Sequence, residues 1–223
     1  LEFLFQSYDK YKDVKYFSQV IDNWKGGFVE RYPDTANKMF SMVKNNGGNF
    51  YYFGHHQTHA ANAFYSSNFD DALIISNNPE TYLEYSKENV MPTTFTISIG
   101  KGTKINRLHI KDINDFNIGA TWNLCLEEIF NLSTGYPYGN QAGTIMAMAC
   151  MGDSSKYIND FREGIHKKSI NIDKFKQIVK NGTEQDKFDI AAAIQRASEE
   201  KIKEQIDSYI QEYKPKNLCL AGG

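Results

Sequence analysis

The sequence predicts an α/β protein, in which strands alternate with helices. Three short apolar or aromatic runs have the length of strands: NFYYFG (49–54), ALIIS (72–76) and NLCLAGG (217–223). Between them, apolar residues recur at helical spacing, most regularly from about 184 to 213. With 41% hydrophobic and 23% charged residues, the 223-residue chain also has the composition of a packed globular protein.

The N-terminal part is predicted to be helical on both sides of the first strand. From about 17 to 44, apolar positions follow a helical period, and the Gly26-Gly27 pair and Pro33 divide the stretch into two helices. After the strand at 49–54, the small and apolar segment HHQTHAANAFYSS (55–67) is predicted to form another helix.

The remaining elements follow in a regular order. A hairpin is predicted from TTFTISIG (93–100) and INRLHI (105–110), because glycines separate two runs that alternate like strands. Later elements are predicted in this order: a helix at 120–132, a Gly- and Tyr-rich loop at 133–143, a buried helix at 144–152, and a long amphipathic helix at 184–213 that Pro215 ends. The last segment, 217–223, is expected to be a buried strand running into a glycine turn.

The net charge and the cysteine content limit the binding partners and the cellular location that are expected. A net charge of -2 argues against a protein built around binding to a phosphate backbone. The three cysteines, Cys125, Cys150 and Cys219, form no CxxC pair, and each lies in an apolar run that predicts a buried thiol. We therefore expect a reducing, cytoplasmic location. The sequence contains no apolar run of membrane-spanning length, so no membrane partner is expected.

The most distinctive local feature is Gly54-His55-His56-Gln57-Thr58-His59. Residues four apart lie on one face of a helix, so the imidazoles of His55 and His59 can converge on one metal ion. His56 points about 100° away and is expected to be structural or to support the ligands. One alternative is that these histidines hydrogen-bond local backbone at a helix start. A zinc-protease motif would need Glu directly after the first His, where this sequence has His56.

Three segments of the chain also resemble three sequence motifs of one enzyme family, and they occur in the same order as in that family. HHQTHAANAFYSSNFDDALIIS (55–76) is similar to a signature HHxxHAAxAFxxSxFxxAL. NIGATWNLCLEEIFNL (117–132) with NQAGTIMAMACMGD (140–153) is similar to a segment ending in G-K-x-M-G-L-A-x-x-G. FDIAAAIQRASEEKIKEQI (188–206) with NLCLAGG resembles an AAxxQxxxEE helix and an LCLAGGVALN loop. From about Asn49 to Gly223, the chain thus resembles the O-carbamoyltransferases of nodulation-factor and antibiotic biosynthesis.

The resemblance implies an actin-like/sugar-kinase type fold, shared with the enzymes that make threonylcarbamoyl-adenosine in tRNA. Residues 1–223 would be an incomplete portion of that fold and part of the carbamoyl-transfer domain. An N-terminal strand and a C-terminal adenylate-forming domain are expected to lie outside the chain. In the family, that partner domain makes carbamoyl-adenylate from ATP and carbamoyl phosphate. The transfer domain then carbamoylates a hydroxyl, here of a small-molecule, sugar or nucleoside acceptor.

The resemblance also implies a divalent metal, usually iron, with His55 and His59 as ligands. Asn78 stands where the family has a ligating Asp, and it can offer a carbonyl oxygen but no charge. A second family Asp would lie beyond Gly223, and the family Lys aligns with Thr144. These departures favour a second hypothesis, a catalytically impaired homologue that binds nucleotide or a partner. An actin-like ATP-hydrolysing kinase would share the fold but would not explain the His pair.

Two further groups of residues are candidates for substrate contacts. Gly222 and Gly223 are predicted to let backbone N–H groups approach the adenylate phosphate, although a plain strand-ending turn is the alternative. Tyr138 and Asn140 are candidates for an acceptor or nucleotide pocket, with a surface turn as the alternative. No residue of the sequence is identified as the catalytic base.

Overall fold

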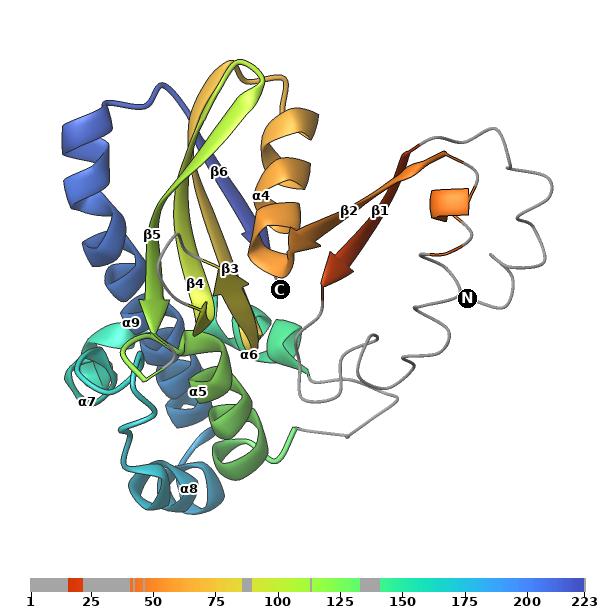
Figure 1. The fold of residues 1–223 in the computed structure, drawn as a ribbon. Helices are drawn as coiled ribbons and strands as arrows, with labels where there is room; N and C mark the ends of the chain where they lie inside the picture. The colour runs from red at the N-terminus through yellow and green to blue at the C-terminus, as the bar shows by residue number, and fades with distance from the viewer. Residues whose placement is uncertain are drawn as a thin grey trace.

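The centre of the protein is a four-stranded mixed sheet with the strand order β5-β4-β3-β6 (Figure 1). The computed structural model describes residues 16–21, 41, 43–45, 47–85, 90–112, 114–132 and 141–222. Three consecutive strands form an antiparallel meander: β3 (Asp71–Tyr85), β4 (Val90–Lys101) and β5 (Lys104–Asp112). The last strand, β6 (Leu218–Gly222), adds parallel to β3. The chain is therefore α/β, as the sequence predicts.

One face of the sheet is covered by helix α4 (His55–Ser66). Its small and aromatic core residues contact the side chains that β3 and β6 direct toward it; the buried members are Ala60, Phe64, Ala72, Ile74 and Cys219. A Cβ added to Gly100 would lie 2.7 Å from the Phe64 ring. The glycine in β4 therefore lets the Phe64 ring lie directly against the sheet.

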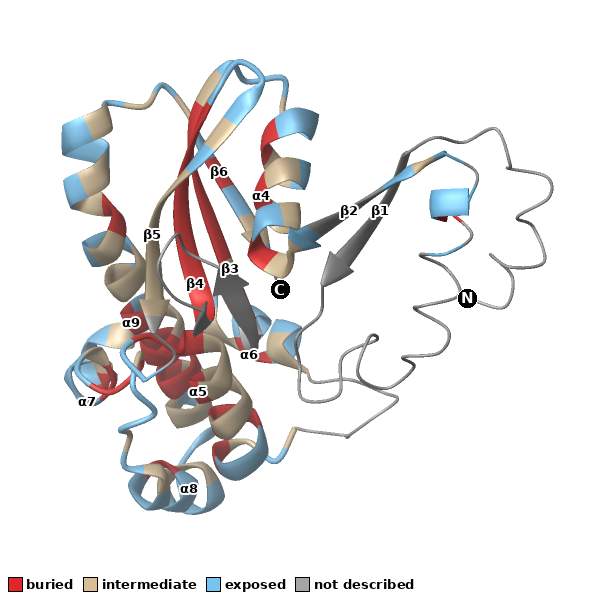
Figure 2. Cartoon of the chain, in the orientation of Figure 1, coloured by how far each residue is buried: buried red, intermediate tan, exposed pale blue. Residues whose placement is uncertain are grey.

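The opposite face of the sheet is covered by α5 (Ile118–Leu124) and by the C-terminal half of α9 (Glu184–Tyr213). Alternation along the strands directs a second set of side chains to this face; the buried cluster is Leu73, Ile75, Phe95, Ile97, Ile99, Phe116, Ile118 and Ile206. Figure 2 shows the central strands as the most continuously buried part of the sheet. The sheet is thus a middle layer between helices.

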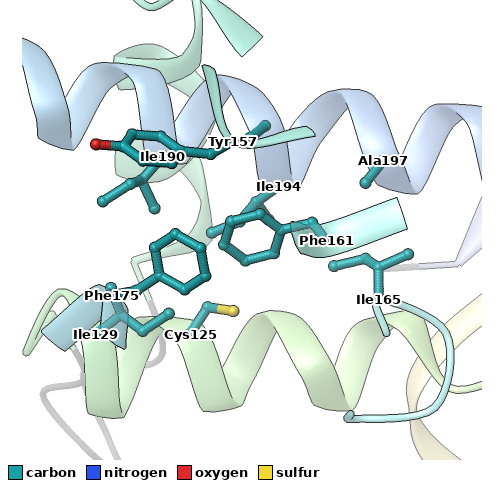
Figure 3. Packing of buried hydrophobic residues seen from close by; sticks show 10 residues of the cluster. Cys125, Ile129, Tyr157, Phe161, Ile165, Phe175, Ile190, Ile194 and Ala197 are labelled. Atoms are coloured by element: carbon teal, nitrogen blue, oxygen red, sulfur yellow. The ribbon is translucent and has the colours of Figure 1, made fainter. Parts of the chain in front are cut away.

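A separate helical core lies below the sheet in the view of Figure 1. It joins a π-helical turn at Cys125–Ile129, α7 (Ile158–Arg162), α8 (Ile172–Asn181) and the N-terminal half of α9. The rings of Phe161 and Phe175 meet at its centre with centroids 4.5 Å apart (Figure 3). Burial here raises the pKa of the Cys125 thiol to about 12, so Cys125 is an inert core residue.

The remaining elements connect these layers. β1 (Tyr16–Ile21) pairs in parallel with β2 (Asn49–Gly54), and β2 leads directly into α4. α6 (Ala142–Ala149) packs against α9, and a 3-10 turn follows at Ser154–Lys156. No helix within the described ranges combines the length and apolar character that a bilayer crossing needs.

The predicted helix beginning at about residue 17 is wrong at its start, where the structure has strand β1. Aromatic and β-branched residues favour a strand, and four of the six residues of β1 are of this kind: Tyr16, Phe17, Val20 and Ile21. The rest of the predicted first helix, up to residue 40, lies outside the described residues. Helical residues are found at 41 and 43–45, within the second predicted helix.

Three predictions of burial are also wrong: those for the helix at 144–152, for the thiol of Cys150 and for the strand at 217–223. In α6 Ile145 is buried, whereas Met146 is 52% exposed and Cys150, just after the helix, is exposed. Only one side of this short helix faces α9, so the apolar run is not covered all round. In β6 the alternating residues Leu218 and Leu220 are 44% and 67% exposed, because α4 covers only the face that carries Cys219.

Candidate metal site at the start of helix α4

The two predicted ligands lie one helical turn apart at the beginning of α4. Gly54, the last residue of β2, has extended backbone angles, and helical geometry begins at His55. This start places His55 and His59 on the same face. Their Nε2 atoms are 3.0 Å apart and their ring centroids 4.6 Å apart. The structure therefore brings the two imidazoles together as the spacing predicts.

The distance between the two nitrogens fits a shared cation. Imidazole nitrogens that ligate one ion at about 2.1 Å, with angles between 90° and 109°, are about 3.0–3.4 Å apart. Without an ion, the same separation suits an N–H of one ring donating to the other. The 3.0 Å separation is thus compatible with a hydrogen bond between the rings and with joint ligation of one ion.

His56 points away from this pair into the protein, and its side chain is fully buried. Its Nδ1 lies 2.8 Å from Ser76 Oγ on β3, and its Nε2 lies 3.3 Å from the carbonyl oxygen of Thr93 on β4. Burial lowers the pKa of His56 from 6.5 to about 4, so the ring is neutral near pH 7. His56 therefore ties the first turn of α4 to two strands, in agreement with the expected structural or supporting role.

Asn78 is placed beside His56. It lies on the α4-facing side of β3 with 5% of its surface exposed, and its Nδ2 is 3.5 Å from His56 Nδ1. Asn78 lies within the stretch where the ladder with β4 changes register, between Asn77 and Tyr82. Asn78 thus contacts the ring of His56, whose centroid is 5.9 Å from that of His55.

Gly222 ends β6 next to this part of β3. It pairs with Asn77 in the parallel ladder and has φ +108, a backbone conformation that favours glycine. A Cβ at this position would lie 1.7 Å from the Asn77 carbonyl oxygen, so only glycine allows the two strands to pair here. Because α4 also contacts β6, the end of β6 lies near the start of α4, where Figure 1 marks the C-terminus.

Thr144 is the remaining predicted position that lies within the described residues. Gly223, Tyr138 and Asn140 lie outside the described residues. Thr144, at the position of the family Lys, is exposed on α6, and its hydroxyl is 3.5 Å from Gln141 Oε1. The structure therefore brings His55 and His59 together, and it places Asn78 against His56 and Gly222 beside Asn77.

Two residues of the site escaped the sequence analysis, Ser76 and Thr93. Ser76 follows Ala72 and Ile74 at alternate positions and directly precedes Asn78 in that series, so the strand period could have placed it on the α4 side. Thr93 could not have been found in this way. Its contact with His56 depends on how β4 is positioned against β3 near the register change.

The donors available at the site limit what it can bind. Among the residues that the structure describes, no cluster of three or more His, Cys, Asp or Glu side chains is formed. Two imidazole nitrogens with an amide oxygen form a neutral set of mixed donors, which suits iron, zinc or manganese better than calcium. Oxygens of a substrate or of water would complete the coordination.

Neither a scan of protein-family models nor a search of curated proteins finds a match to this chain.

Proposed function

We propose that residues 1–223 are part of the carbamoyl-transfer domain of an O-carbamoyltransferase with an actin-like/sugar-kinase type fold. The observation that carries the proposal is the 3.0 Å separation of His55 and His59 Nε2 at the start of α4. It occurs in the segment that resembles the HHxxHAA signature of that family. The mixed sheet between α4 and α9 is compatible with the proposed fold.

The proposed reaction moves a carbamoyl group from carbamoyl-adenylate to an acceptor hydroxyl. The C–O bond to the adenylate phosphate breaks, a C–O bond to the acceptor forms, AMP leaves, and a base removes the hydroxyl proton. A divalent cation, most simply iron, would polarise the carbamoyl carbonyl. His55, His59 and the Asn78 amide oxygen are the residues that would hold it. His56 fixes the helix start on which the pair depends.

The neighbouring backbone supports a place for the adenylate. Gly222 carries no side chain where β6 approaches β3, and glycine turns after strands are common phosphate contacts. An adenylate-forming domain would supply the donor from ATP and carbamoyl phosphate. The acceptor would be a small molecule, a sugar or a nucleoside.

A second candidate function is a metal-free homologue that binds nucleotide or a partner without transfer. The specific observation in its favour is Asn78, which is uncharged where the family has an Asp. A neutral ligand set holds a cation less strongly than one that contains a carboxylate. The two candidates differ in whether the His pair binds an ion and in whether AMP release depends on an acceptor.

A transfer assay separates them. The protein would be incubated anaerobically with ferrous iron, carbamoyl-adenylate and a panel of hydroxyl acceptors, and AMP and the acceptor mass would be measured. The proposal expects acceptor-dependent AMP release and an acceptor heavier by one carbamoyl group. A His55→Ala/His59→Ala variant should lose both. Gln57→Ala, an exposed position on the same helix, is the matched control. Nucleotide binding without any transfer would favour the second candidate.

A further inference from the structure

A cavity of about 530 Å³ lies between α6 and α9, and it shares no residue with the site at the start of α4. A volume of this size is typical of sites for small molecules. One side of the cavity is formed by α6 and the turn that follows it, and includes Met146, Ala149 and Cys150. The other side is formed by residues of α9 that recur at helical spacing: Ala192, Gln195, Arg196 and Glu199.

One part of the cavity surface is apolar. Ala149 and Ala192 contribute only methyl groups to it, so the space above them is left open. Ala192 is itself 7% exposed, whereas Met146 is 52% exposed at the border of the cavity. A methionine side chain is flexible and adapts to the shape of an apolar ligand. This part of the cavity therefore suits an aliphatic group.

Arg196 and Glu199 form the charged part of the cavity surface. Arg196 Nη1 and Glu199 Oε2 are 3.8 Å apart, which is too far for a hydrogen bond. Each group is instead fixed by another side chain: Arg196 Nε donates to Glu200 at 3.1 Å, and Glu199 Oε1 accepts from Gln195 at 2.8 Å. Neither makes a further hydrogen bond within the described part of the chain. The pair therefore offers N–H donors and a carboxylate oxygen close to each other.

The charges around this pair are balanced. Glu200 also accepts from Arg162 Nε at 2.9 Å, so two carboxylates and two guanidinium groups lie together. A ligand with a single charge would be attracted by one member of the Arg196–Glu199 pair and repelled by the other. A ligand that carries both charges would be attracted by both members.

We propose that this cavity binds a free α-amino acid with an aliphatic side chain. The ammonium and carboxylate groups of such a ligand are attached to the same carbon, so one can meet Glu199 and the other Arg196. The carboxylate accepts from the Nη groups of Arg196, and the ammonium donates to Glu199 Oε2. The aliphatic side chain lies against Ala192 and Met146. This inference goes beyond the proposed transfer reaction and requires no metal ion.

Matched ligands test the requirement for both charges. Leucine would be compared with 3-methylbutylamine, which lacks the carboxylate, and with 4-methylpentanoate, which lacks the ammonium group. Affinities would be measured by NMR titration of the methionine methyl signals, which include that of Met146. Because each charged contact is made through hydrogen bonds, leucine should bind at least about tenfold more tightly than either analogue.

Matched variants test the two side chains. Arg196→Gln and Glu199→Gln should each weaken leucine binding by about tenfold or more. Arg162→Gln is the control, because Arg162 also donates to Glu200 but does not line the cavity, and its affinity should stay within about twofold of that of the parent protein. Bound leucine should also slow the reaction of Cys150 with iodoacetamide, since Cys150 lines the same cavity.

Several results would overturn the inference. Equal binding of leucine and of one singly charged analogue would show that the Arg196–Glu199 pair does not recognise a zwitterion. Parental affinity in both Arg196→Gln and Glu199→Gln, or an unchanged rate of Cys150 modification, would place bound leucine elsewhere. A folded parent protein that binds no leucine at millimolar concentrations would also contradict it. None of these measurements uses iron or carbamoyl-adenylate, so their outcome is independent of the proposed function.

Discussion

Acid should destabilise the metal-free protein through His56. In the unfolded chain this side chain takes up a proton near pH 6.5, but burial prevents protonation in the folded state until the pH is about 4. Its contribution to the free energy of unfolding is therefore complete above pH 6.5 and is lost as the pH falls toward 4. One pKa unit corresponds to about 1.4 kcal/mol, so the full loss is about 3 kcal/mol.

The measurement is urea unfolding at a series of pH values in the presence of a chelator, on the parent protein and on His56→Gln. The parent protein should lose up to about 1.4 kcal/mol per pH unit more than the variant between pH 6 and pH 5. Other groups titrate in both proteins, and the lowered pKa values of His109 and His166, both caused by partial burial, give slopes of the same sign. Only the difference between the two proteins therefore reports His56. Parallel curves would refute the argument from burial.

Three further predictions concern Gly222, Asn78 and the cysteines. Gly222→Ala should lower the free energy of unfolding by about 1–3 kcal/mol in urea titrations, or detach β6 as seen by hydrogen exchange, because its Cβ would clash with the Asn77 carbonyl oxygen. Asn78→Asp should bind ferrous iron at least about tenfold more tightly, since it adds a negative charge, and unchanged affinity would contradict a ligand role for position 78. Cys150, which is exposed, should react with a thiol reagent in the folded protein, whereas Cys125 should react only after unfolding, as mass spectrometry can show.

Much of the fold could be predicted because its signals are local. The helix at Glu184–Tyr213 and the hairpin of β4 and β5 agree with the predicted periodicity and turn residues. The spacing of His55 and His59 is of the same kind, since four residues on a helix fix the face on which both rings lie.

The features that could not be predicted from the sequence depend on contacts between segments that are far apart along the chain. β1 becomes a strand because β2, more than thirty residues later, offers it a parallel partner. Leu220 is exposed because β6 is the last strand of the described sheet, a position that no local pattern contains. The contacts of His56 with Thr93 on β4 and with Asn78 on β3 join three elements that are far apart in the sequence.

Iron bound per chain is the measurement that tests the central claim most directly. Protein handled anaerobically with ferrous iron would be freed of excess metal and subjected to elemental analysis, together with His55→Ala/His59→Ala and the Gln57→Ala control. The proposed site predicts one ion per chain in the parent protein and in the control, and none in the double variant. A folded parent protein that retains no ion, or a double variant that retains as much as the parent, would contradict the claim that His55 and His59 form a metal site.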